Sequence, residues 1–136
     1  MAEPAYRSPA ADLRLAAEGM RKDAEAATPG PWKHMCLGSE GCLVIRDSDA
    51  VTIRERGRGR VARFGCKEWK PDHADAEYVA GMHPAVALAV ADWLEAEAGS
   101  ASGMDGYEDS DAYPLMLAGF RHPLAVARAY LGETNA

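Results

Sequence analysis

A histidine–proline pair divides the longest helix-forming stretch of the chain, and it constrains the fold more than any other feature. Residues 75–98, DAEYVAGMHPAVALAVADWLEAEA, are rich in helix formers, yet His83 and Pro84 stand in the middle. The residue before a proline is pushed out of the α region, whereas proline itself suits the first turn of a helix. The sequence therefore predicts two helices with a corner between them. The first ends at residues 81–82, and the second begins at Pro84.

Helical periodicity predicts two further helices, one near each end of the chain. Ser8 and Pro9 have the residue types of a helix cap and first turn, and TPGPW at residues 28–32 ends the helix that follows. HPLAVARAYLGE, at residues 122–133, predicts the last helix. We expect the buried stripe of the helix after Pro84 to be formed by Val86, Val90, Trp93 and Leu94.

The middle of the chain is rich in the residues of short strands. CLVIRD, VTIRER and RVARF are rich in β-branched residues, and Trp32 begins an extended segment. LGSEG at residues 37–41 and GRG at residues 57–59 are typical turns. The pattern predicts an antiparallel meander of three or four strands, with one face against helices and one basic face.

These elements predict an α+β protein in a single domain, residues 1–136. The expected order is an N-terminal helix, the β-meander of three or four strands, and two or three C-terminal helices packed on one face. Residues 1–7 are expected to be flexible. Residues 98–111, AGSASGMDGYEDSD, are small, polar and acidic, and predict a mobile loop.

Charge is unevenly distributed along the chain. The net charge is −6, and residues 71–120 contain no Lys or Arg, whereas residues 46–70 are basic. Such segregation can steer partners. The favoured explanation is that the two halves attract one another, or that each is simply a solvated face. The first ten residues lack the apolar core of a signal peptide, and no apolar run approaches the ~20 residues of a membrane span. We therefore expect a cytoplasmic protein without a membrane partner.

Three cysteines and a histidine form the most suggestive set of possible metal ligands. Cys36, Cys42, Cys66 and His73 have the composition of a structural zinc site, and Cys36 and Cys42 flank the predicted turn at residues 37–41. Their spacing is wider than that of zinc knuckles, and buried cysteines often serve as small apolar residues. The sequence favours buried thiols and no cofactor, with zinc as the alternative.

The same region offers the residue types of a thiol hydrolase. Cys66 with His73 and Asp72 or Asp75 is such a set, in which a histidine activates the cysteine and a carboxylate orients the histidine. Short proteins often contain these residues without using them in this way. The prediction therefore favours a non-enzyme without catalytic residues, and a thiol or metal-dependent enzyme stays an alternative.

A run of arginines is the strongest candidate for binding an anion. Arg54, Arg56, Arg58 and Arg60 alternate within RERGRGR, and Trp69 follows as a possible stacking surface. Basic residues at a hairpin tip also keep an exposed strand edge from pairing. Because the protein is acidic overall, nucleic acid is the less favoured ligand, and a nucleotide-like anion or a protein is preferred.

AEAATPGPW, DAEYVAGMHPAVALAVADWLEA and LAVARAYLGE together resemble a group of uncharacterised accessory proteins of phages, prophages and actinobacteria. The layout is similar to that of early-region accessory proteins of lambda-like phages. The resemblance implies a phage-type accessory module in the host cytoplasm that binds a host protein or a small anionic ligand, with counter-defence as one role. A small nucleic-acid-binding protein that uses the arginine hairpin, residues 54–63, is the alternative. The resemblance implies no site residues, and the oligomeric state stays open.

Overall fold

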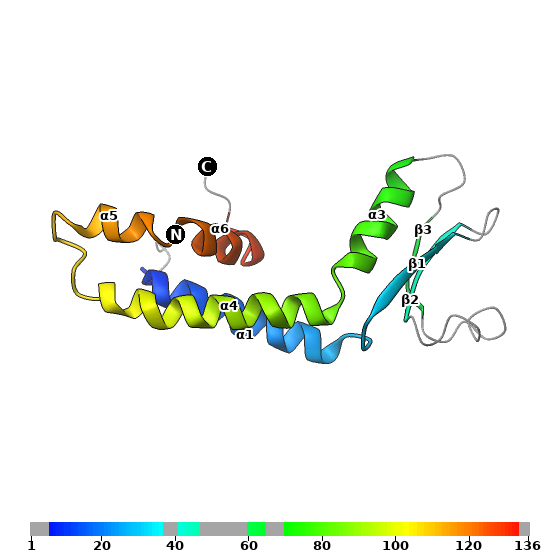
Figure 1. The fold of residues 1–136 in the computed structure, drawn as a ribbon, viewed down its shortest axis with the longest axis horizontal. Helices are drawn as coiled ribbons and strands as arrows, with labels where there is room; N and C mark the ends of the chain where they lie inside the picture. Colours follow the sequence, from blue (N-terminus) through cyan, green and yellow to red (C-terminus); the bar gives the residue numbers. More distant parts are fainter. Residues whose placement is uncertain (1–5, 37–40, 47–59, 65–69, 134–136) are drawn as a thin grey trace, which may run out of the picture. The chain divides into compact units, whose positions relative to one another are not determined.

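Helices and a small antiparallel sheet make up the computed structural model, which describes residues 6–36, 41–46, 60–64 and 70–133 (Figure 1). This composition confirms the predicted α+β class. The elements are, in order, α1 (Pro9–Ala26), β1 (Trp32–Cys36), β2 (Cys42–Arg46), β3 (Arg60–Phe64), α3 (Lys70–Gly81), α4 (Pro84–Ala101), the 3₁₀ turn η3 (Ser102–Met104), α5 (Tyr113–Ala118) and α6 (Arg121–Tyr130).

The chain, for which the sequence predicts one domain, divides into two compact units. One is formed by residues 23–88 and contains the sheet. The other, the helical unit, is formed by residues 1–22 and 89–136.

The first helix begins where the sequence predicts. The Oγ of Ser8 accepts a hydrogen bond of 3.1 Å from the backbone N–H of Ala11, which is the cap, and Pro9 is the first residue of α1. Arg7, which the sequence assigns to a flexible segment, donates to Oδ1 of Asp12 over 2.7 Å. Asp12 is almost fully buried and also lies 3.3 Å from Nε of Arg128. Its buried charge is therefore compensated by two guanidinium groups.

The helical unit has a core of alanines, leucines and methionines. Ala10, Leu13 and Ala17 of α1 pack against α4 and α6, and the small side chains allow the helices to lie close together (Figure 1). Arg21 of α1 contacts Asp92 at 2.9 Å, and also Glu95, both on α4. Among the described residues, no helix is long and apolar enough to cross a bilayer.

Two predictions for α4 are wrong. Trp93 is 39% exposed, because Leu94 occupies the inward position and Trp93 points about 100° away around the helix. The loop predicted from residue 98 is helical as far as Ala101. Ala98 and Ala101 follow Leu94 at helical spacing and are fully buried, so they continue the inward face rather than a mobile loop.

The sheet has three strands in the order β1-β2-β3, both pairs antiparallel, as predicted. VTIRER lies outside the described residues. Ala76 and Ala80 of α3 cover one face of the sheet, where they meet Cys42 and Val44. Leu43 and Ile45 on the other face are buried, so β2 makes that face apolar rather than basic. α4, α5 and α6 pack with α1 in the core of the other unit.

The histidine–proline corner has the predicted form. α3 ends at Gly81 and α4 begins at Pro84. The turn at residues 28–31 packs against this corner, since a Cβ on Gly30 would lie 3.0 Å from Nδ1 of His83. Glycine at position 30 therefore lets the two turns approach one another closely.

Candidate metal site at the end of the hairpin

The register of the first hairpin brings two cysteines and a histidine together. β1 pairs with β2 so that Cys36 stands opposite Cys42, and His34 stands opposite Val44. Side chains alternate between the two faces of a strand, so His34 and Cys36 point to the same face. That face is the one that α3 covers. Three side chains with metal-binding atoms thus converge beneath a helix, at the turn end of the hairpin.

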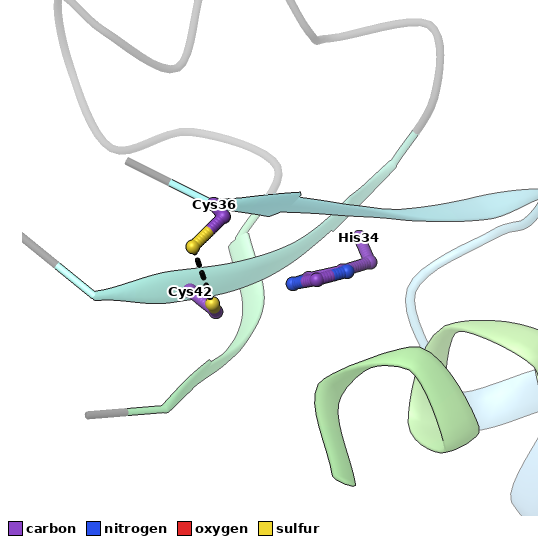
Figure 2. Close-up of side chains that lie close together, drawn as sticks. All are labelled: His34, Cys36 and Cys42. Carbon is purple, nitrogen blue, oxygen red and sulfur yellow. Dashed lines mark hydrogen bonds between the residues drawn. The ribbon is translucent and has the colours of Figure 1, made fainter. Parts of the chain in front are cut away.

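The three ligand atoms are close enough to share one ion. All lie within 4.8 Å of one another, and the Sγ atoms of Cys36 and Cys42 are 2.9 Å apart. Figure 2 shows the ring of His34 extending toward the two sulfurs. Ligand atoms around a zinc ion are about 3.3–3.8 Å apart, given Zn–S bonds of about 2.3 Å and Zn–N bonds of about 2.0 Å. Shifts of about an ångström would therefore complete the arrangement.

A carboxylate stands on the other side of the histidine. Oε1 of Glu77, on α3, is 3.9 Å from Nδ1 of His34. Nε2, the far nitrogen of the ring, is buried. Glu77 lies mostly in solvent, whereas the His34 side chain is 14% exposed. Metal-binding histidines usually present one nitrogen to the ion and hydrogen-bond the other to a carboxylate or carbonyl. Glu77 lies on the side of the ring where such a partner would stand, at a distance longer than a hydrogen bond.

The two cysteines differ in exposure and in chemical state. Cys36 is an exposed free thiol. Cys42 is fully buried and is disulfide-bonded. Because the thiolate is the form that binds metal, Cys42 could serve as a ligand only when that disulfide is reduced. The site therefore belongs to the reduced protein.

The structure brings together part of the predicted zinc set. Cys36 and Cys42 face each other across the hairpin, as expected. Cys66 lies outside the described residues. His73 belongs to the first turn of α3, but its side chain is likewise outside them. The roles of Cys66 and His73, as zinc ligands or with Asp72 and Asp75 in a thiol hydrolase, stay predictions.

His34 is the ligand that the sequence reasoning missed. The signal was present in WKHMC, because a histidine two residues before a cysteine shares its face of a strand. The prediction placed an extended segment from Trp32 onward, but it did not consider which side chains of that segment share a face of the strand. The strand and the register of the hairpin were both needed to place His34 beside Cys42.

The arginine hairpin cannot be placed. Arg54, Arg56, Arg58 and Trp69 lie outside the described residues, and Arg60 begins β3 with its side chain also outside them. Anion binding by these residues stays a prediction.

No family model, curated protein or solved structure matches the chain. The candidate site therefore stands on its own geometry.

Proposed function

We propose that the protein is a small non-catalytic binding module whose β-hairpin is fastened by a zinc ion. The observation that carries this proposal is the convergence of His34, Cys36 and Cys42, whose ligand atoms lie within 4.8 Å of one another. Two thiolates and an imidazole are soft and borderline ligands, which select zinc over magnesium or calcium. Three protein ligands leave one position of a zinc tetrahedron for a fourth ligand.

A zinc ion at this position would stabilise the sheet directly. Cys36 ends β1 and Cys42 begins β2, so one ion would join the two strands at the turn end of their hairpin. A sheet of three short strands gains much from such a cross-link, because small β structures are marginally stable in water. Metal binding then contributes to the free energy of folding.

The sheet, once stabilised by zinc, would hold the ends of the segment that is proposed to bind a partner. Residues 47–59, which connect β2 to β3, include three of the four arginines predicted to bind an anion or a protein. A sheet whose far end is held by metal gives such a connection fixed ends, which lowers the entropy lost on binding. We propose an accessory module of the phage type, with a host protein or a small anion as the ligand.

Metal analysis of the reduced protein tests the proposal. Protein purified without chelators and kept reduced should contain about one zinc per chain. Cobalt should replace the zinc and give the absorption of thiolate-to-cobalt charge transfer. Chelation should lower the melting temperature, because the ion binds the folded state.

Matched variants locate the site. Cys36→Ser and His34→Ala should each remove stoichiometric metal. His122→Ala changes an exposed histidine of the helical unit and should leave the metal content unchanged. If reduced wild-type protein contains no metal and gives no cobalt spectrum, the zinc proposal is wrong.

A further inference from the structure

Helix α5 is apolar on two sides, although one helix face is enough to join the core. Tyr113, Met116 and, beyond the helix, Phe120 pack against the core of the helical unit. Pro114 and Leu115 point away from that core, and Leu115 is 81% exposed. A helix that is apolar all round is usually covered on every side. The outward side of α5 therefore has the composition of an interface.

This outward side continues into a groove between α5 and α6. The groove has a volume of about 360 Å³, and its apolar lining includes Leu117 of α5 and Leu124 of α6. Arg121 and Arg128 line it as well. Leu115 follows Pro114, one of the lining residues, and points about 100° away from it around the helix. The groove is large enough to hold an aliphatic side chain such as that of a leucine.

Charges of opposite sign flank the apolar face. Asp109 and Asp111 precede α5 and are exposed, and Arg121 follows the helix and is exposed as well. α5 has six residues, so it spans roughly 9 Å. The chain therefore passes from acidic residues before α5, through the apolar helix, to a basic residue after it. Leu115 lies near the middle of this stretch.

We propose that a second copy of this chain covers the face. Two α5 helices related by a two-fold axis perpendicular to them run antiparallel, so the acidic end of each meets the basic end of the other. Leu115 of each copy enters the groove of the second copy, and Asp111 faces Arg121 of the second copy. Both copies use the same residues in this contact, so the assembly stops at a dimer and does not grow further.

The expected dimer is weak and depends on concentration. The contact rests on one exposed leucine per chain and on charge pairs at the surface, and each such pair contributes little. Small interfaces of this kind are typical of transient association. High salt should weaken the dimer, because the charge pairs stand in solvent.

Charge reversal tests the contact. Restoration of the dimer by mixing two charge-reversed variants cannot be produced by variants that misfold. Sedimentation of the full chain should show a monomer–dimer equilibrium for the wild type. Asp111→Arg and Arg121→Asp should each be monomeric, because each places like charges opposite one another. An equal mixture of these two variants should again dimerise, because each arginine then faces an aspartate of the other variant.

A further variant supplies the control. Glu18→Arg reverses an exposed charge on α1 of the same unit and should leave the dimer intact. A wild type that remains monomeric at high concentration overturns the proposal, and the face would then belong to a different protein. A mixture of the two α5 variants that remains monomeric overturns it as well. Neither outcome depends on metal, so the zinc proposal is tested separately.

Discussion

His34 connects the hairpin to the helix above it. Its ring extends from β1 toward the two sulfurs, and its Nδ1 is 3.9 Å from Oε1 of Glu77 on α3. If the carboxylate moved into hydrogen-bond range, it would hold the ring in the tautomer that presents Nε2 to a metal and would increase the basicity of that nitrogen. A residue outside the proposed ligand set would then influence how tightly the ion is held.

Replacing Glu77 with Gln should weaken zinc binding by roughly 10–100-fold, which is the usual cost of losing an outer partner of a ligand. The side chain keeps its size, so the change acts through charge and hydrogen bonding. Cobalt competition on reduced protein measures the affinity. Asp75→Asn removes the same charge from an exposed position of α3 and is the control. Equal affinities for the wild type and Glu77→Gln would show that Glu77 does not act on the site.

Among the elements, most helix and strand positions follow from local sequence. Ser8, Pro84 and the turn at residues 28–31 act through their own backbone preferences, so the cap, the corner and the end of α1 were predictable. What each element packs against depends on residues distant in the chain. The partners of α4 and the burial of Leu94 instead of Trp93 are decided by α1 and α6. Similarly, Cys36 and Cys42 were paired from their turn, whereas His34 required the register.

Leu94 and Trp93 test which face of α4 belongs to the core. Leu94→Ala should lower the free energy of unfolding by about 2–5 kcal/mol, because Leu94 is fully buried. Trp93→Ala should cost less than Leu94→Ala, despite the larger side chain, because Trp93 is 39% exposed. Denaturation with urea compares the two variants. The reverse order would place Trp93 in the core.

At the scale of the whole molecule, the chain has separate cores in its two units. Cys42, Val44, Ala76 and Ala80 form one core within residues 23–88. Leu13, Leu94 and Leu124 belong to the other. The proposed metal lies entirely in the first unit, so its contribution to stability should be confined there. Local stability in proteins varies in this way between cooperative units.

Hydrogen exchange should reveal this separation. Removing metal from the reduced protein should speed amide exchange in β1, β2 and α3, because the ion joins the strands that α3 covers. Exchange in residues 89–101 of α4 and in α6 should change little. Mass spectrometry of peptic fragments measures both regions in one sample. Equal acceleration in both units would show that they unfold together.

The path of the chain through the two units also determines when each can be completed during synthesis. α1 leaves the ribosome well before Leu124 and Ala127, which share its core. Residues 23–88 complete their own unit in the meantime. At about 5–20 residues per second, α1 then waits on the order of ten seconds for α6, with only α4 available to cover its apolar face in the meantime. During translation part of that face is thus open to chaperones, and a chain truncated before α6 would leave that part exposed.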